Sequence, residues 1–334
     1  MRKLASVRKI LNVIEHTNAE KLGIYIIEGW QVIDQKGKYE AGDLVVYCEI
    51  DSFLPVKPEF EFLRKTSFRK MGVLEGFRLK TIRLRGELSQ GLILPISVLG
   101  SDHSFEIGDD VSEYLGIVKY EPPVPEHLAG EALGLFPGFI PKTDEERVQN
   151  LDYHTLKSHP YFVTEKLDGS SCTMYFCDGH FGVCTRNLEI KETENNGYWG
   201  AARRMKIEEI LNSTGRNLAL QGELIGYRIQ SNPYKLNHTE FRLFKMYDID
   251  KKRYIDIPEM LDFAETHNIP AVPLIDSSFL LPNTVQELLA IADGISALHQ
   301  DAKREGLVLI AHDNENVHFK VISNLFLEGE QDNF

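Results

Sequence analysis

Apolar and polar residues alternate in short runs over the first third of the chain. Four runs are rich in β-branched and aromatic residues, and Gly, Asp and Asn separate them; they cover residues 23–33, 43–50, 77–86 and 92–96. Alternation with a period of two predicts β-strands that bury one face. About five such strands in this region predict a small β-barrel over residues 1–112.

The pattern changes twice after this region. Residues 113–142 are rich in Pro and Gly and carry no regular apolar period, which predicts a linker. Residues 143–334 mix the helical and strand periods, which predicts an α+β domain. Strands are expected at 161–164, 172–176, 181–185, 217–226, 241–249, 306–311 and 317–322, and helices at 197–212, 257–267 and 284–303. Thr143 is expected to cap a further helix that ends before Pro160.

The overall composition is that of an ordinary globular protein. A length of 334 residues agrees with two domains. The net charge of −13 argues against non-specific nucleic-acid binding, although it leaves room for a local basic patch. The four cysteines form no CxxC pair and no zinc-ligand spacing, so we expect reduced thiols and an intracellular protein. No run of ~18 apolar residues occurs, so no membrane span is expected.

Residues 64–85 form a basic segment within this acidic chain. Only Glu75 opposes eight cations, which are Arg64, Lys65, Arg69, Lys70, Arg78, Lys80, Arg83 and Arg85. One interpretation is a solvated face of strands and loops. The other is a surface that follows a phosphate backbone, which would suit an OB fold, the natural candidate for the barrel. Arg78, Lys80, Arg83 and Arg85 are the candidate nucleic-acid contacts.

A possible nucleophile lies behind the first predicted strand of the second domain. The stretch VTEKLDGSS places Lys166 two residues before Asp168 and three before Gly169. A lysine attacks phosphorus only as the free amine, so its pKa has to be lowered by burial, by nearby cations or by a metal. The aspartate could help to hold a metal or a sugar, and the glycine lets backbone approach a ligand closely. Taken alone, such a short motif could equally mark a surface lysine.

Further candidate site residues lie within or beside predicted strands farther along the chain. They are Arg186 and Asn187 in GVCTRNLEI, Glu223 in GELIG, Phe244 and Tyr247 in FKMYDID, Glu305 in REGLVL, and His318 and Lys320 in VHFK. A buried carboxylate is costly without a partner, so Glu223 and Glu305 indicate a nearby cation or ligand. The alternative is that both are hydrogen-bonded carboxylates with a structural role.

These stretches, in this order over residues 140–325, resemble the motifs of the covalent nucleotidyltransferases, the superfamily of polynucleotide ligases and capping enzymes. The resemblance implies an adenylyltransferase domain with an ATP-grasp-like antiparallel sheet and helices. A barrel before this domain, with only 14 residues after Lys320, resembles the ATP-dependent RNA ligases with an N-terminal OB domain, the Deinococcus and Naegleria type. A DNA ligase is the alternative enzyme. A non-catalytic RNA-binding protein is the third possibility, and the intact motif residues argue against it.

The resemblance implies a three-step reaction with ATP and Mg²⁺ or Mn²⁺. Lys166 attacks the α-phosphate of ATP and becomes lysyl-AMP. The AMP then moves to the 5′-phosphate of a polynucleotide, and a 3′-hydroxyl attacks that activated end to form a phosphodiester bond. The expected partner is RNA with 5′-phosphate and 3′-hydroxyl ends, in particular a nicked duplex with an RNA 3′-hydroxyl strand, and the enzyme is expected to be a monomer.

The resemblance also implies a role for each matched residue. Asp168, Glu223 and Glu305 would hold the metal directly or through water, and Mg²⁺ typically keeps several waters. Lys320 would bind the α-phosphate and lower the pKa of Lys166. Arg147, Gly169, Arg186 and Asn187 would also contact the nucleotide. Phe244 or Tyr247 would stack on the adenine, and the backbone around Thr164 and Glu165 would contact its edge.

His318 departs from the pattern of many relatives, which have two lysines one residue apart in this last motif. Histidine is mostly neutral at pH 7. Either Lys320 acts alone, or His318 makes the handling of pyrophosphate sensitive to pH. For Arg147 an ordinary helix salt bridge is the alternative role.

Overall fold

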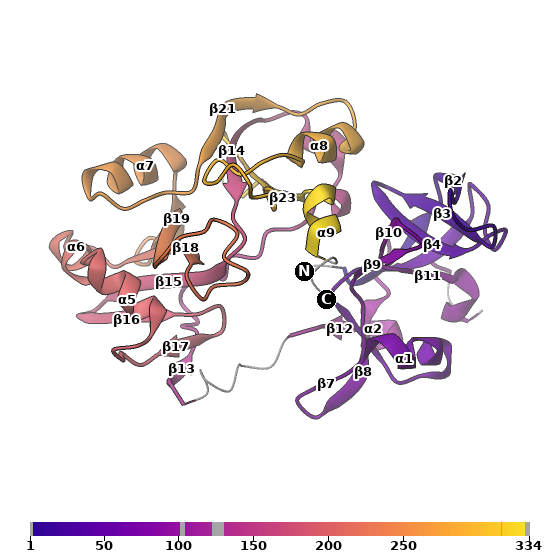
Figure 1. Cartoon of the computed structure of the whole chain (residues 1–334), viewed down its shortest axis with the longest axis horizontal. Coiled ribbons are helices and arrows are strands. Elements are labelled where there is room, and N and C mark those ends of the chain that lie inside the picture. The colour runs from indigo at the N-terminus through magenta and orange to yellow at the C-terminus, as the bar shows by residue number, and fades with distance from the viewer. Residues whose placement is uncertain (1–2, 101–103, 122–129, 315, 331–334) are drawn as a thin grey trace. The chain divides into compact units, whose positions relative to one another are not determined.

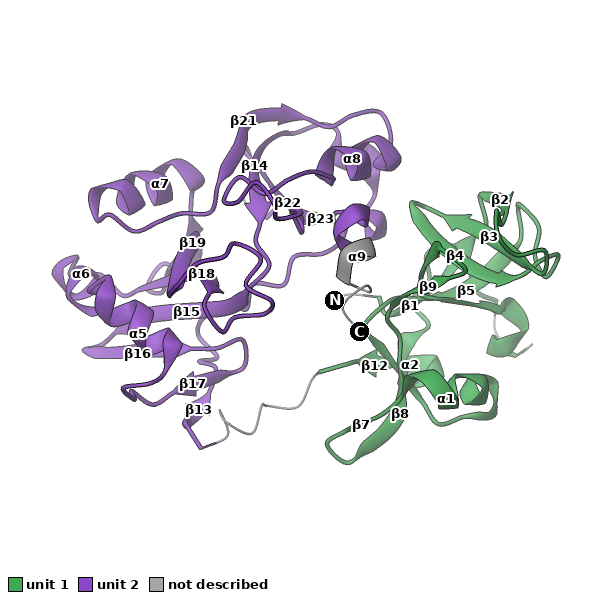
Figure 2. Cartoon of the chain, in the orientation of Figure 1, with its two compact units in different colours: residues 1–123, 328–334 green, residues 124–327 purple. Residues whose placement is uncertain are grey.

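The computed structural model describes residues 3–100, 104–121, 130–314 and 316–330 (Figure 1). The chain divides into two compact units, residues 1–123 with 328–334 and residues 124–327 (Figure 2). Each unit has its own apolar core and is described separately.

The first unit consists of short antiparallel strands, as the alternating pattern predicts. One sheet contains β1 (Ala5–Lys9), β5 (Leu44–Cys48) and β11 (Leu92–Pro95), and a second contains β2 (Asn12–Glu15), β3 (Leu22–Ile27) and β4 (Trp30–Gln35). A third sheet has the order β12 (Val118–Lys119), β6 (Ser52–Pro55), β8 (Leu74–Arg78) and β7 (Phe68–Met71). A separate hairpin is formed by β9 (Thr81–Leu84) and β10 (Glu87–Gln90). Two apolar clusters fill the unit, one around Phe60 and Phe77 and the other around Trp30 and Tyr47. Several strands are buried over consecutive residues, such as Val45 to Cys48 of β5, whereas β2 is exposed along its whole length.

The hairpin of β9 and β10 carries part of the basic segment to its tip. Leu84 pairs with Glu87, so only Arg85 and Gly86 form the turn. Both have positive φ, 54° and 99°, which is the backbone of a two-residue hairpin turn whose twist matches that of the strands. The turn therefore holds Arg85 at the end of a rigid ribbon.

The predicted linker contains regular structure at both ends. α2 (Ser112–Leu115) and β12 continue the first unit beyond residue 112, since Val118 pairs with Phe53 of β6. β13 (Ala132–Leu135) lies at the edge of a sheet in the second unit. Strand β13 is mostly exposed, so it has no apolar period by which the sequence could reveal it. The boundary at residue 142 stays a prediction.

The second unit contains two antiparallel sheets. The larger has the order β13–β17–β16–β15–β18–β19–β20 and the smaller β21–β14–β22–β23. Their strands are β14 (Pro160–Lys166), β15 (Ser170–Cys177), β16 (His180–Cys184), β17 (Leu188–Ile190), β18 (Leu218–Gly226), β19 (Thr239–Asp248), β20 (Arg253–Ile255), β21 (Leu274–Leu280), β22 (Gly306–Ala311) and β23 (His318–Ile322). β14 belongs to the smaller sheet and β15 to the larger one. Residues 167–169 are thus the crossing between the two sheets.

Helices cover one face of the larger sheet. α5 (Gly197–Arg204), α6 (Ile207–Ser213) and α7 (Ile257–Thr266) bury Trp199, Leu211 and Met260 in one cluster with Met174 and Leu220 of the sheet (Figure 1). Successive side chains of a strand point to opposite faces. Thr173, Gln221 and Glu223 therefore lie on the face that these helices leave uncovered.

Three predicted helices differ from the structure. The helix expected over 197–212 is broken between α5 and α6, because Lys206 has a left-handed backbone with φ of 54°. The helix expected over 284–303 ends with α8 (Val285–Ala292), because Asp293 is extended. The helix expected from Thr143 is wrong. The backbone oxygen of Glu146 instead accepts a hydrogen bond from the Lys320 amide, which places this segment beside β23.

The remaining helical pieces are short or lie at the end of the chain. A 3₁₀ turn (Val148–Asn150) and α4 (Tyr153–Leu156) follow the segment beside β23, and α9 (Asn324–Glu330) follows β23 itself. α8 covers the smaller sheet, where Leu288 joins a cluster with Leu309 and Phe319. None of the helices in the described ranges has the length and hydropathy needed to cross a membrane.

Candidate active site

Lys166 occupies the last position of β14 and faces a carboxylate. In the ladder between β14 and β22 it pairs with Gly306, so Glu305 lies immediately beside it. Lys166 Nζ donates a hydrogen bond to Glu305 Oε1 at 2.6 Å, and both side chains are largely buried. The structure thus brings together two of the predicted site residues that are 139 residues apart in the chain.

Glu223 and Asp168 add two more negative charges around the same amine. Glu223 lies on β18 opposite Ser171, which is the second residue of β15. Burial raises the pKa of Glu223, Lys166 lowers it, and repulsion from Glu305 and Asp168 raises it again, to about 8. The site therefore has more negative charge than the lysine alone can offset.

The expected lowering of the Lys166 pKa is wrong for the chain without ligands. Burial lowers the pKa of Lys166, but Glu305, Glu223 and Asp168 together outweigh it, so the pKa lies above its ordinary value. The lysine is a cation here. It becomes a nucleophile only when positive charge reaches these carboxylates or when they are protonated.

Gly169 is required by packing inside the protein. A Cβ at this position would lie 2.5 Å from the Leu224 carbonyl oxygen and 2.7 Å from Glu223 Cγ. The backbone of the crossing can therefore lie this close to β18 only if residue 169 has no side chain. Two side chains from the segment after β18 fix its backbone, since Tyr234 Oη accepts a hydrogen bond from the Asp168 amide at 2.7 Å and Gln230 Nε2 donates one to the Gly169 oxygen at 2.9 Å.

Asp144 contacts two cations that were predicted to bind phosphate. Its Oδ2 lies 3.0 Å from Arg186 Nη2 and its Oδ1 lies 3.6 Å from Lys320 Nζ. Arg147, three residues later, is almost fully buried and lies beside Lys320 through a parallel backbone bridge. Asn187 accepts a hydrogen bond from Lys142 through its Oδ1 at 2.8 Å.

Glu145 makes a second and more deeply buried set of ion pairs. Its Oε1 lies 2.6 Å from Lys245 Nζ, and its Oε2 pairs with Nδ1 of His318. Burial raises the pKa of Glu145, but the His318 hydrogen bond and the Lys245 charge lower it to about 2. Sequence reasoning missed Asp144, Glu145, Lys245 and Tyr234. The available signal was the acidic run directly before Arg147, and it was assigned to the first turn of a helix.

The two aromatic candidates for adenine stacking lie in different places. Phe244 is the extra residue of a β-bulge, because Gln221 pairs with Lys245 and Gly222 with Leu243. It packs beside Leu167 of the crossing. Tyr247 instead packs in a separate cluster, with its ring centroid 5.2 Å from that of Tyr254.

Thr164 and Glu165 belong to β14 and are both buried. Thr164 Oγ1 donates a hydrogen bond to the Val308 oxygen at 3.5 Å. The carboxylate of Glu165 accepts a hydrogen bond from the Ala297 amide at 2.8 Å, so its side chain anchors the segment that leads to Glu305. Its other carboxylate oxygen, Oε1, is buried without a hydrogen-bond partner among the described residues.

The residues around Lys166 fit a divalent cation held largely through water. Carboxylate oxygens are the ligands that Mg²⁺ and Mn²⁺ prefer, and Glu223, Glu305 and Asp168 all act on the charge of Lys166. Within the described residues, no group of three or more His, Cys, Asp or Glu side chains is close enough to hold a metal directly. Mg²⁺ commonly keeps several waters and takes only one or two carboxylates from a protein.

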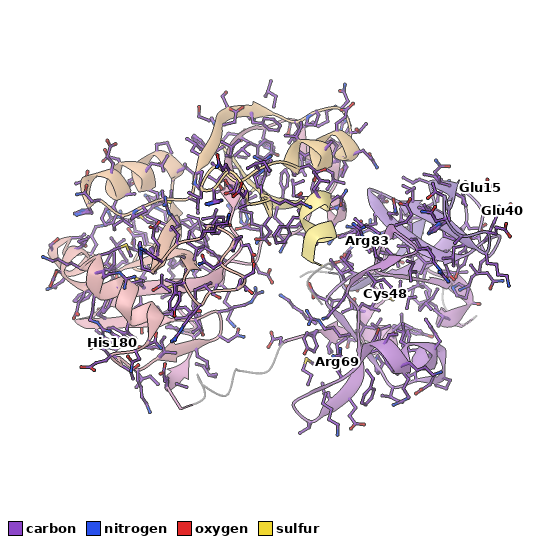
Figure 3. All side chains as sticks on the ribbon, viewed as in Figure 1. Glu15, Glu40, Cys48, Arg69, Arg83 and His180 are labelled. Carbon is purple, nitrogen blue, oxygen red and sulfur yellow. The ribbon has the colours of Figure 1, made fainter. Side chains whose placement is uncertain are left out.

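The candidate nucleic-acid contacts differ in their surroundings. Arg78 is partly buried, lies 3.2 Å from Asp51 and covers the ring of Tyr120. Lys80, Arg83 and Arg85 are exposed. Figure 3 labels Arg83 on the β9–β10 hairpin and Arg69 on β7, so the basic segment is spread over two hairpins of the first unit.

Comparisons with known proteins agree with this arrangement. Residues 4–96 match a family model described as an OB-fold domain, and residues 159–322 match one described as RNA ligase. No curated protein matches the sequence. An OB fold followed by a nucleotidyltransferase domain with this lysine and these carboxylates defines an RNA ligase with an N-terminal OB domain.

The solved structures give the particular relatives. A structure titled Naegleria gruberi RNA ligase with PPi is 44% identical, with a TM-score of 0.86, covering 99% of this chain and 100% of that one. A lysine mutant of the same ligase with AMP and Mn is also 44% identical, with a TM-score of 0.87 and the same coverage. The chain belongs to the RNA ligase family, and both the OB fold and the ligase domain predicted from the sequence are confirmed.

A side chain at position 169 should disturb the site without touching a ligand. We expect Gly169→Ala to push the crossing away from β18 and to slow lysyl-AMP formation roughly 10- to 100-fold, because displacements of about 1 Å have effects of this size. Gly138→Ala is the matched control, since a Cβ there meets nothing within 4 Å. The measurement is the rate of covalent labelling by α-labelled ATP, and equal rates for both variants would contradict the packing argument.

Proposed function

We propose that this RNA ligase seals 5′-phosphate and 3′-hydroxyl ends with ATP through lysyl-AMP on Lys166. The observation that carries the proposal is the ion pair of Lys166 with Glu305, flanked by Glu223 and Asp168. A lysine that is surrounded by carboxylates can gain nucleophilicity when a cation offsets the charge of those carboxylates. This makes the nucleophile conditional on the bound nucleotide and metal.

In the first step the nitrogen of Lys166 attacks the α-phosphorus of ATP. An N–P bond forms as the bond to pyrophosphate breaks. Glu305 Oε1, which already accepts a hydrogen bond from Nζ, is placed to take the proton. Asp168, Glu223 and Glu305 would hold the divalent cation, which when bound offsets the charge of the phosphates and of these carboxylates.

The phosphates of the nucleotide would be met by Lys320, Arg147 and Arg186. In the chain without ligands Asp144 contacts Lys320 and Arg186, and its side chain is partly exposed. A phosphate carries more charge than a carboxylate and would replace Asp144 at these cations. We place Phe244 beside the adenine, because it lies next to the crossing and Tyr247 does not.

The substrate that we propose is a nick with an RNA 3′-hydroxyl strand. The AMP moves from Lys166 to the 5′-phosphate, and the 3′-hydroxyl then displaces AMP as the phosphodiester forms. The N-terminal OB fold with its exposed arginines supports a nucleic-acid duplex as partner. We further propose an intracellular monomer, and the four free cysteines support the intracellular location.

Covalent labelling tests the first step. Incubation with α-labelled ATP and Mg²⁺ should label the wild type, and Lys166→Ala should abolish the label because no other amine takes this position. Lys191→Ala, an exposed lysine of the same unit, is the control and should keep it. Chelation of the metal should also prevent labelling. An unlabelled wild type would rule out the proposed chemistry.

The nature of the sealed strand is tested with matched nicks. We expect a nick with RNA on the 3′-hydroxyl side to be sealed faster than an all-DNA nick of the same sequence, because the 2′-hydroxyl distinguishes the two. Gel analysis of pre-adenylated substrates removes the ATP step from the comparison. Equal sealing of both nicks would contradict the assignment of an RNA 3′-end.

The role of the β9–β10 hairpin is tested by neutralising its charges. Arg83→Gln with Arg85→Gln should weaken nick sealing and flatten its salt dependence, because fewer counterions are released on binding. Lysyl-AMP formation should stay unchanged. Lys21→Gln with Lys36→Gln removes two exposed cations elsewhere in the same unit and should leave sealing intact. Equal losses in labelling and sealing would argue against a nucleic-acid contact.

A further inference from the structure

Two neighbouring carboxylates connect the two sheets of the second unit. Asp144 contacts Arg186, which follows β16 of the larger sheet, and Lys320 on β23 of the smaller one. Glu145 repeats this pattern with Lys245 on β19 of the larger sheet and His318 on β23 of the smaller one. Each carboxylate therefore links one basic side chain from the larger sheet with one from the smaller sheet.

The two links differ in how easily they can be replaced. Arg186 is half exposed, so its pair with Asp144 is screened by water and can exchange for a phosphate. Lys245 and Glu145 are only 8% and 11% exposed. Lys245 also lies over the ring of Tyr254 at 4.8 Å from the centroid. Removing one partner of such a pair leaves a buried charge without compensation, which is strongly unfavourable.

The partners of Glu145 are neighbours of residues that we place on the nucleotide. Lys245 directly follows Phe244, and the bulge puts both side chains on the face that carries Glu223. His318 lies two residues before Lys320 and therefore on the same face of β23. In the ladder of the smaller sheet Lys320 lies opposite Val308, and Val308 lies opposite Thr164, two residues before Lys166.

We propose that Glu145 is a positioning residue. It sets the distance between the larger sheet, which carries Phe244 and Glu223, and the smaller sheet, which carries Lys166 and Lys320. This rests on the proposed reaction with ATP. Glu145 touches neither the nucleotide nor the reacting atoms, and it acts through Lys245 and His318. A nucleotide that spans both sheets then meets its base contact and its phosphate contacts at a fixed separation.

The same assignment explains the histidine in the last motif. His318 replaces a lysine of many relatives, and its Nδ1 is directed to Glu145. It therefore serves the link between the sheets and leaves the phosphates to Lys320. A direct role of His318 on pyrophosphate predicts a different result in the experiment that follows.

The test is a double-mutant cycle on lysyl-AMP formation measured over a range of ATP concentrations. We expect Glu145→Gln to raise the half-saturating ATP concentration roughly 10- to 100-fold, as for other small displacements of binding groups. His318→Gln should raise it less. The double variant should equal Glu145→Gln, because both changes break one link. Glu192→Gln, in the exposed ion pair with Arg203, is the control and should match the wild type.

Thermal unfolding and circular dichroism of each variant separate positioning from stability. A Glu145→Gln protein with a lowered melting temperature but wild-type ATP dependence would overturn the proposal. Additive effects of Glu145→Gln and His318→Gln would also overturn it, since they would place His318 on the triphosphate itself.

A variant that does not fold, and a failure of the proposed reaction, can each be distinguished from a failure of this inference. If Glu145→Gln does not fold, Glu145→Asp keeps the charge and shortens its reach. A raised half-saturating ATP concentration then supports the proposal, and a wild-type value overturns it. An unlabelled wild type would remove the proposed function together with this inference, whereas a labelled wild type with unaffected variants removes the inference alone.

Discussion

The crossing from β14 to β15 takes three residues, and this short connection constrains the rest of the second unit. The ladder of the smaller sheet fixes Lys166 beside Gly306, and the ladder of the larger sheet fixes Ser171 beside Glu223. Because residues 167–169 join these fixed points, the amine and the carboxylates of two different sheets have to lie close together. Gly169 supplies the close approach, and Tyr234 and Gln230 hold the backbone that makes it.

Charge is divided between the two ends of the site. Around Lys166 three carboxylates surround one amine, and they raise the pKa of Lys166 against the effect of burial, while burial is the main cause of the raised pKa of Glu223. Around Lys320, Arg186 and Lys245 the three cations pair with two carboxylates, Asp144 and Glu145. A nucleotide with its metal would bring positive charge to the first group and negative charge to the second. The two groups of charges are therefore complementary to a nucleotide with its metal.

The sequence predicts most of the central strands, because apolar runs are local signals. Strands β14, β15, β18 and β22 follow such runs, whereas the exposed strand β21 does not and was missed. Lys166 ends β14, Glu305 directly precedes β22 and Glu223 lies within β18. The role of Glu145 has no local signal, since its partners lie 100 and 173 residues away. The acidic run from Asp144 to Glu146 has the pattern of a first helical turn, and only the hydrogen bond to the Lys320 amide decides against it. The sign of the Lys166 pKa shift likewise depends on three carboxylates that only the fold assembles.

The bulge at Phe244 affects where the chain can accommodate insertions and deletions. On one side of the bulge Leu243 points toward the helices, and on the other side Met246 does, three positions later. Loss of Phe244 would restore strict alternation and keep Lys245 opposite Gln221, but it would remove the side chain that packs against the cluster of Leu167. A change of length is easier to accommodate in a turn such as the one at Gly179, where a Cβ would meet nothing within 4 Å. Among related sequences, the spacing between the third motif and the aromatic strand should be tuned in the loop that separates them, while the strand itself keeps its count.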